Sequence, residues 1–157
     1  MSEELPERPV SSEPNYVTPS GLDQLRGRVE TLQTEHARLK QAAEAFDRPR
    51  LAEVERDLRY YQARLESAIL VNVAAQPGDQ VRFGASVQTE DESGARHIFA
   101  IVGEDESDVV HGKVSWQSPL ATALIGAKVG DTVTWDRPAG KATLEVLDIQ
   151  YPGSRKA

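Results

Sequence analysis

The chain has 157 residues and a net charge of −7, with a sequence pI of about 5.0. This acidic balance opposes broad binding to bare nucleic acid, because phosphate contacts need a clustered excess of Lys and Arg. The absence of cysteine excludes disulfides and Cys-ligated zinc and fits a reducing compartment. No apolar run approaches the roughly 20 residues that span a bilayer, and no basic-then-apolar signal pattern opens the chain. We therefore expect a cytoplasmic protein that contacts no membrane and has a protein partner.

Residues 1–16 hold four Glu, three Pro and three Ser with few apolar side chains, so we expect a disordered acidic tail without a functional site. Thr18 then offers an N-cap hydroxyl and Pro19 a preset first helical position, which predicts the start of a helix. Gly21 and Gly27 follow inside that helix, where each costs about 1 kcal/mol relative to Ala. Their presence indicates that this end of the helix packs closely against a second domain.

Residues 22–68 carry an apolar seam, with side chains at steps of 3 or 4 on both sides of a break around Pro49. Pro49 lacks a backbone N–H and disfavours the α conformation at Arg48, so the first helix is predicted to end near Phe46 and the second to begin at about Pro49. A seam of period 3.5 stays aimed at a partner helix, and so short a connection makes that partner the other arm of an antiparallel αα-hairpin. The second arm, roughly 20 residues, makes a finger about 30 Å long. The seam consists of Leu22, Leu25, Val29, Leu32, His36, Leu39, Ala43, Phe46, Leu51, Val54, Leu58, Tyr61, Leu65 and Ala68.

Charged residues of both signs flank the seam on both arms. We interpret them as the solvated flanks of a coiled coil, with a ligand-binding stripe as the alternative. His36 lies in the seam itself, where a core histidine that shares a hydrogen bond is favoured over a pH-sensitive register device. No second histidine lies at metal-ligand spacing from it.

After Leu70 the apolar period changes, residues 69–73 leave the helix, and Gln76-Pro77-Gly78-Asp79 supplies turn residues at the boundary. The short apolar runs that follow predict a small antiparallel sheet with two hairpins, and the last run slips by one residue, as a β-bulge makes it. The expected class is α+β: an antiparallel coiled-coil hairpin over residues 17–73 and a small sheet domain over residues 77–152. The runs are Val81 with Phe83, Val87, Ile98–Val102, Val114 with Trp116, Val133 with Trp135, and Leu144–Tyr151; the hairpin turns are Glu92-Ser93-Gly94 and Pro138-Ala139-Gly140.

One short helix interrupts the predicted strands. Ser118 can cap it, Pro119 suits its first turn, and Gly126 can take the left-handed conformation that ends it. We expect this helix to lie on the sheet and close its core. Its apolar face consists of Leu120, Ala121, Leu124 and Ile125.

Motifs that carry chemistry are sparse. Neither a Ser-His-Asp nor a Cys-His set can be assembled from three histidines and no cysteine, and no glycine-rich loop joins a strand to a helix as in nucleotide-binding motifs. The densest charge of the second domain, Glu104-Asp105-Glu106-Ser107-Asp108, is either a solvated loop or a contact for a basic or polar patch on a partner protein. At the hairpin tip, Glu44 and Asp47 either hold Mg²⁺ in trans or are only polar helix ends.

Several short motifs follow one another in the second domain with a fixed order and spacing. Two more lie on the helical arms: Thr18-x-x-Gly21 with Leu25 on the first arm, and the run Arg50–Tyr61 on the second. The motifs of the second domain are Phe83-Gly84-Ala85, Ile101-Val102-Gly103 followed by the acidic loop 104–108, the run Ser118–Gly126, Val129-Gly130-Asp131 and Pro138-Ala139-Gly140.

This series resembles the C-terminal domain of the bacterial GreA/GreB transcript cleavage factors, and the arms look like those of GreB. The resemblance covers about residues 16–151. It implies a coiled-coil finger on an FKBP-like body that docks on RNA polymerase at the rim of its secondary channel, with only indirect contact to DNA and RNA. It also implies partner-binding roles in the second domain, for Asp105, Glu106, Asp108, Ser118 and Pro119.

The tip of the finger departs from this family. The family's signature, Gly-Asp-x-x-Glu-Asn-Ala-x-Tyr, supplies the acids that hold a second metal for RNA hydrolysis, and this chain has no counterpart between Phe46 and Arg50. Both arms look shorter than in the family by about two turns, or roughly 10 Å.

We therefore favour a regulator of elongation that binds RNA polymerase as a monomer, with weak or no stimulation of transcript cleavage. We expect that it is not an enzyme and that it has no catalytic residue and no cofactor of its own. The alternative is an active stimulator of RNA cleavage, in which Glu44 or Asp47 reaches a Mg²⁺ ion shared with the polymerase active site. A prolyl isomerase-like binding module is more remote, because the scattered aromatic residues are sufficiently explained as sheet core. A dimerising coiled coil is the fourth hypothesis.

Overall fold

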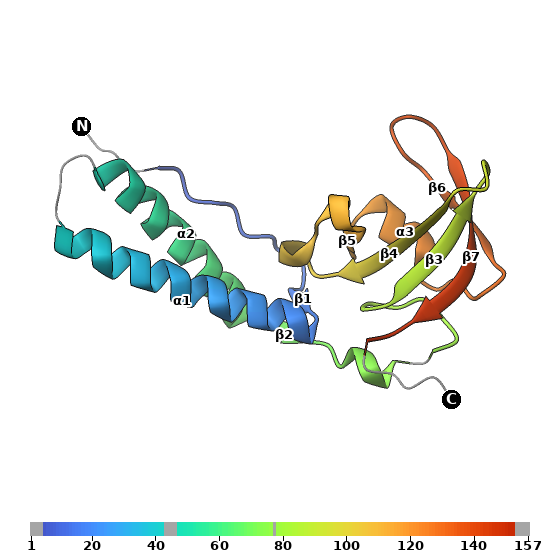
Figure 1. The fold of residues 1–157 in the computed structure, drawn as a ribbon, viewed down its shortest axis with the longest axis horizontal. Coiled ribbons are helices and arrows are strands. Elements are labelled where there is room, and N and C mark those ends of the chain that lie inside the picture. The colour runs from blue at the N-terminus through green and yellow to red at the C-terminus, as the bar shows by residue number, and fades with distance from the viewer. Residues whose placement is uncertain (1–4, 43–46, 77, 153–157) are drawn as a thin grey trace. The chain divides into compact units, whose positions relative to one another are not determined.

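The structure of the chain, a computed structural model, describes residues 5–42, 47–76 and 78–152. It divides into two compact units, which we call the hairpin unit (residues 1–15 and 22–69) and the body (residues 16–21 and 70–157) (Figure 1). The predicted α+β class is confirmed, because a helical N-terminal part precedes a curled sheet. The division also assigns the first turn of the first helix to the body, which the predicted boundary at residue 73 does not do.

Two long helices, α1 (Pro19–Ala42) and α2 (Arg48–Ser67), supply the hairpin (Figure 1). Each begins at the predicted place, because the Thr18 hydroxyl accepts a backbone hydrogen bond in the first turn of α1 and Pro49 stands in the first turn of α2. Residues 43–46, and with them the predicted helix end near Phe46, lie outside the described ranges. At 1.5 Å per residue, α1 is about 36 Å long and α2 about 30 Å.

The hairpin seam has a small buried centre. His36 belongs to the seam, and its Nε2 lies 3.3 Å from the carboxylate of Glu55 on α2. The favoured interpretation, a core histidine that shares a hydrogen bond, is therefore correct for the hydrogen bond, but the side chain of His36 is only partly buried. The buried centre consists of Leu32, Leu39 and Val54, and the partly buried Leu51, Leu58 and Tyr61 pack against it.

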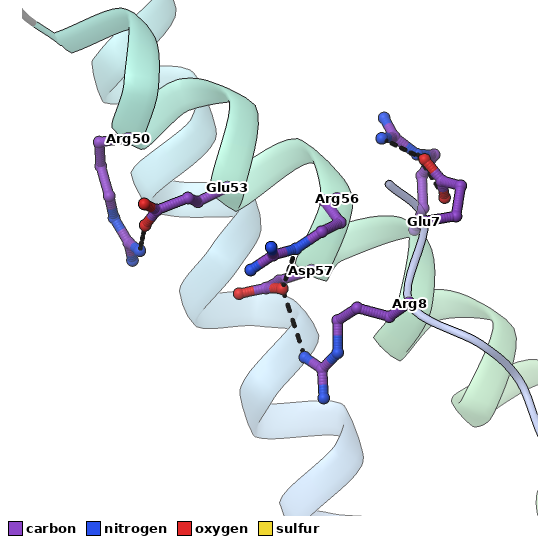
Figure 2. Close-up of polar contacts among 7 residues, drawn as sticks. Glu7, Arg8, Arg50, Glu53, Arg56 and Asp57 are labelled. Carbon is purple, nitrogen blue, oxygen red and sulfur yellow. Dashed lines mark hydrogen bonds and ion pairs between the residues drawn. The ribbon is translucent and has the colours of Figure 1, made fainter. Parts of the chain in front are cut away.

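Residues 5–15, which we call the strap, run along α2 instead of forming the expected disordered tail (Figure 1). The Arg8 guanidinium lies 3.3 Å from the Asp57 carboxylate (Figure 2). It also lies 4.0 Å from the centre of the Tyr60 ring. Glu7 forms an ion pair of 2.6 Å with Arg59. The strap has too few apolar side chains for a core of its own, but α2 supplies the aromatic and charged partners that its composition lacks.

The last residue of the strap is fixed more deeply than the rest. Asn15 donates a hydrogen bond of 2.7 Å to the backbone oxygen of Arg64 and accepts one of 2.7 Å from the Arg64 guanidinium. Both side chains are buried. A charged guanidinium is costly to bury without such partners, so this pair fixes the strap at the C-terminal part of α2.

The body is built on a five-stranded sheet with the order β5-β4-β3-β7-β6 (Figure 1). Most neighbours are antiparallel, as predicted, but β4 and β5 are parallel, so the sheet is mixed. The run Val81–Phe83 forms no strand, although Val81 is buried in the core. The strands are β3 (Ser86–Asp91), β4 (Arg96–Val102), β5 (Lys113–Ser115), β6 (Thr132–Trp135) and β7 (Ala142–Gln150).

A bulge curves the sheet where β3 and β7 pair. Gln88 lies opposite Asp148 and Thr89 opposite Val146, which leaves Leu147 as an extra residue of β7. The predicted phase slip is thus confirmed. Both predicted hairpin turns are also present, with Gly94 and Gly140 at positive φ.

Helix α3 (Pro119–Leu124) closes the core of the body. Its buried Leu120, Ala121 and Leu124 pack with the buried residues of β3, β4 and β7. The Ser118 hydroxyl caps the helix by accepting the Ala121 N–H (3.2 Å).

Two short strands lie where the chain passes between the units, β1 (Tyr16–Val17) and β2 (Ile69–Leu70). Within the body, the Tyr16 ring lies 5.2 Å from the Trp116 ring. The N–H of Val71 donates to the oxygen of Val17 (3.0 Å). These contacts fix residues 16–18 in the body ahead of α1.

Candidate functional site

The parallel pairing of β4 and β5 brings the predicted partner-binding segments to one end of the sheet. Val102, at the end of β4, lies opposite Ser115, at the end of β5. The acidic loop 104–108 follows directly after β4, and α3 begins shortly after β5. Because parallel strands end at the same edge, both segments leave the sheet together. An antiparallel pair, which the sequence predicts here, would have separated them.

The acidic loop has regular local structure. Glu104–Glu106 form a 3₁₀ turn, and Asp108 then pairs its backbone with Lys113 at the start of β5 through two hydrogen bonds of 2.9 Å. The carboxylate of Asp108 is exposed and lies 2.6 Å from Nδ1 of His111. This hydrogen bond lowers the pKa of Asp108, so the carboxylate stays ionised at neutral pH and can meet a partner.

Glu106 lies differently from its neighbours in the loop. Its side chain is buried and accepts hydrogen bonds from the N–H groups of Gly103 (3.0 Å) and Thr18 (3.1 Å) and from the Thr18 hydroxyl. Asp105 is partly buried. The structure therefore places Glu106 inside the body and not on a docking surface.

The other predicted contact residues stand at the start of α3. The Ser118 hydroxyl is used as the helix cap, and Pro119 is exposed beside it. The exposed surface of this turn is thus mainly the proline ring. An apolar ring next to a polar cap is suited to the interior of a protein interface more than to its charged rim.

Two exposed valines at the acidic loop were missed by reasoning from the sequence. Val109 and Val110 follow Asp108 in a 3₁₀ turn and are 84% and 90% exposed. The sequence does contain a signal for them, because two adjacent valines directly follow an acidic run and belong to no alternating pattern. Exposed neighbouring apolar residues of this kind mark a candidate interaction surface.

At the hairpin tip, the structure describes only one of the two predicted acids. Asp47 precedes α2 and makes no side-chain cap hydrogen bond with it. Glu44 lies outside the described residues. Within the described ranges, no three His, Cys, Asp or Glu side chains come together in an arrangement that could hold a metal. None of the helices in those ranges has the length and apolar character needed to cross a membrane.

A pocket of about 480 Å³ opens on the core face of the sheet between the two hairpin turns. Phe99 and Trp135 line it with their rings 6.5 Å apart, and both are partly buried against the core. The turn below it is rigid, because Asp91 accepts hydrogen bonds from Ser93, Ala95 and His97. Those contacts, first from Ser93 and then from His97, lower the pKa of Asp91 to about 2.

Comparison with known proteins gives consistent relatives. The family "Transcription elongation factor, GreA/GreB, C-term" matches residues 76–151. GreB of Neisseria meningitidis serogroup B is 32% identical over 153 residues, which cover 87% of this chain and 94% of the relative. GreA of Nitratidesulfovibrio vulgaris strain Miyazaki F is 30% identical over 155 residues, which cover 89% of this chain and 97% of the relative.

Solved structures give related matches. GreA factor homolog 1 of Thermus thermophilus is 24% identical with a TM-score of 0.43, covering 88% of this chain and 99% of that one. A GreA/GreB factor from Nitrosomonas europaea is 22% identical with a TM-score of 0.43, covering 87% and 99%. The stretch aligned with the Neisseria GreB runs over 153 residues but uses 87% of 157, about 137, so about 16 of its positions have no counterpart in this chain.

These relatives correct one expectation. The prediction that the chain is not an enzyme is wrong as a statement about catalysis, because Gre factors stimulate the transcript cleavage that RNA polymerase performs, although they lack intrinsic catalytic activity. The sequence has no nucleophile paired with a general base. This lack does not exclude a role in a catalysed reaction, because RNA polymerase performs the cleavage that Gre factors stimulate. With relatives at least 30% identical over most of its length, the chain belongs to the GreA/GreB family of transcription elongation factors.

Proposed function

We propose that this protein binds RNA polymerase at the rim of the secondary channel and regulates elongation from there, with weak stimulation of transcript cleavage. A general role in elongation comes with the family. The finer proposal concerns where the protein binds and how little cleavage follows. We further propose that the protein acts in the cytoplasm, where bacterial polymerase works, and that it acts as a monomer.

The body supplies the docking surface. Asp105 and the exposed Asp108 offer negative charge, and the exposed Val109 and Val110 next to them in the chain offer apolar area, as does the exposed Pro119 at the start of α3. A partner that fits has an apolar centre bordered by basic or polar side chains. Glu106 is left out of this surface because its carboxylate is buried.

The hairpin is the part that enters the channel. The small number of acids at its tip is the reason to expect weak cleavage. The chain has no acidic tip signature of the family, and Asp47 is the one acid at the described part of the tip. Mg²⁺ needs oxygen ligands at about 2.1 Å, so a metal shared with the polymerase needs an acid that reaches it. The absence of a counterpart to the family's tip signature between Phe46 and Arg50 supports a shorter finger. Short reach and few acids both reduce cleavage.

Active stimulation of cleavage is the second candidate. The acids at positions 44 and 47 favour it, since one or two carboxylates suffice for a mostly hydrated Mg²⁺ ion. Asp47→Asn and Glu44→Gln separate the two candidates. If the wild-type protein cleaves rapidly and either variant abolishes cleavage, the active candidate is correct. Unchanged slow cleavage in both variants supports weak stimulation.

The docking surface is tested by affinity for polymerase. The double change Asp105→Ala with Asp108→Ala is expected to weaken binding about threefold to tenfold at moderate salt, because rim charges steer association more than they hold the complex. Val109→Ser with Val110→Ser tests the apolar part in the same assay. Glu145→Gln, at an exposed position of β7, is the control that removes a charge elsewhere. Equal affinity in all variants would move the contact to another surface.

A further inference from the structure

The buried Glu106 carboxylate has no part in the proposed docking surface, yet burying it is costly. An ionised carboxylate in the interior is tolerated only when hydrogen bonds replace its water. Three donors do so here: the N–H groups of Thr18 and Gly103 and the Thr18 hydroxyl. Two of the three come from Thr18, which is 88 positions away in the chain and directly precedes α1.

The Thr18 hydroxyl extends this connection into α1. It donates to Glu106 and accepts the N–H of Gly21, 3.0 Å away, as the helix cap. A carboxylate at a helix N-terminus is also favoured by the helix dipole. Through one hydroxyl, Glu106 thus holds the first turn of the finger's first helix.

The packing around Glu106 leaves no room for adjustment. A Cβ at Gly21 would lie 2.1 Å from Cδ of Glu106, and a Cβ at Gly103 would lie 2.4 Å from the backbone oxygen of Tyr16. Both contacts are far shorter than van der Waals distance. The prediction that a glycine in α1 marks close packing is therefore confirmed for Gly21, whereas a Cβ at Gly27 would meet nothing within 4 Å.

We propose that Glu106 is a positioning residue that locks the first turn of α1 to the acidic loop. A partner that binds the loop at Asp105 and Asp108 then restrains the start of the finger through this carboxylate. The lock itself belongs to the free protein. Its transmission to a partner rests on the proposed function. A variant without the Glu106 carboxylate is therefore expected to keep its docking on polymerase but to lose part of the effect of the finger.

The lock is tested in the free, full-length protein by amide hydrogen exchange. In Glu106→Gln, an NH₂ group replaces the oxygen that accepts the Thr18 hydroxyl, or the oxygen that accepts the two N–H groups. At least one of the three hydrogen bonds is therefore lost together with the charge, so the amides of residues 18–24 are expected to exchange about tenfold faster, while those of β3 and β7 keep their wild-type rates. Thr18→Val removes the relaying hydroxyl and is expected to act alike, with little further change in the double variant. Glu145→Gln controls for the lost charge. Unchanged exchange at residues 18–24, or equal acceleration throughout the body, would overturn the lock.

Transmission is tested with RNA polymerase in backtracked elongation complexes. Glu106→Gln is expected to bind polymerase within about threefold of the wild type, yet to need about tenfold more protein to compete with an active GreB. A residue that only stabilises the body would lower the affinity for polymerase and the competition with GreB together. That result would overturn the proposed transmission from the acidic loop to the finger. Wild-type protein that does not bind polymerase would overturn the proposed function and transmission, whereas the lock is judged by exchange in the free protein.

Discussion

The hairpin unit and the body are stabilised in different ways. The body has a continuous core in which Ile101, Leu124 and Val146 are fully buried and enclosed by α3 and the curled sheet. The hairpin has a narrow seam in which Leu32, Leu39 and Val54 form the only buried apolar cluster among its described residues, and partly exposed side chains and surface ion pairs supply the rest. A finger of two helices is therefore stabilised by a few buried contacts, whereas the sheet domain is stabilised by many.

The largest expected loss of stability is in the body core. Leu124→Ala removes a fully buried side chain of α3 and leaves a cavity, so the free energy of unfolding should fall by about 3 to 5 kcal/mol. Denaturation followed by tryptophan fluorescence measures it, because both tryptophans, Trp116 and Trp135, belong to the body. Thr122→Ala, on the exposed side of the same helix, is the control. A loss no larger than the control's would show that α3 does not close the core.

The matched change in the hairpin should cost less. Leu32→Ala lies in the buried centre of the seam, but the thin unit can relax around the cavity, so we expect about 2 to 4 kcal/mol. Helical circular dichroism measures this loss, and Gln33→Ala at the exposed neighbouring position is the control. If Leu32→Ala and Leu58→Ala each cost under about half a kcal/mol, the assigned seam is incorrect.

The strap should contribute still less. Arg8→Ala removes the guanidinium from Tyr60 and Asp57, at a cost of about 0.5 to 1 kcal/mol to the hairpin. The Arg59 contact lowers the pKa of the exposed Glu7, so this pair should weaken as salt rises. Arg26→Ala, which removes an exposed ion pair of α1, is the control. If Arg8→Ala lowers the free energy of unfolding no more than Arg26→Ala does, the strap does not stabilise the hairpin.

The smallest expected effect is a pH dependence at the β3–β4 turn of the body. Because the pKa of Asp91 is lowered from 3.8 to about 2 on folding, its stabilisation is present above pH 3.8 and is lost as the pH falls towards 2. The titration of its carboxyl carbon by NMR measures this directly. A midpoint near 4 for Asp91 would contradict the rigid turn.

Local signals in the sequence predicted most of the fold. The caps at Thr18 and Ser118, the proline at the start of α2 and the phase slip at Leu147 each have a local physical cause, so they could be read without the structure. The parallel pairing of β5 and the ordered strap could not, because both depend on partners distant in the chain. Short strands of three residues carry too little pattern to show their direction.

The candidate site was predicted only in part for the same reason. The acidic loop stands out by composition, but composition does not distinguish the exposed Asp108 from the buried Glu106. That difference arises when Thr18, far away in the chain, brings two donors to one of the two acids. Burial of a charge follows from tertiary partners, which a run of similar residues does not reveal.

The length of the RNA in a backtracked elongation complex shows whether this protein stimulates transcript cleavage. At fixed Mg²⁺, the protein is added alone and then titrated against an active GreB. The account predicts little cleavage by the protein alone and a dose-dependent fall in the cleavage stimulated by GreB, since one channel admits one finger. Grafting the family's acidic tip between Phe46 and Arg50 should restore part of the activity. Cleavage by the unmodified protein at a rate like that of GreB, abolished by Asp47→Asn, would contradict the account.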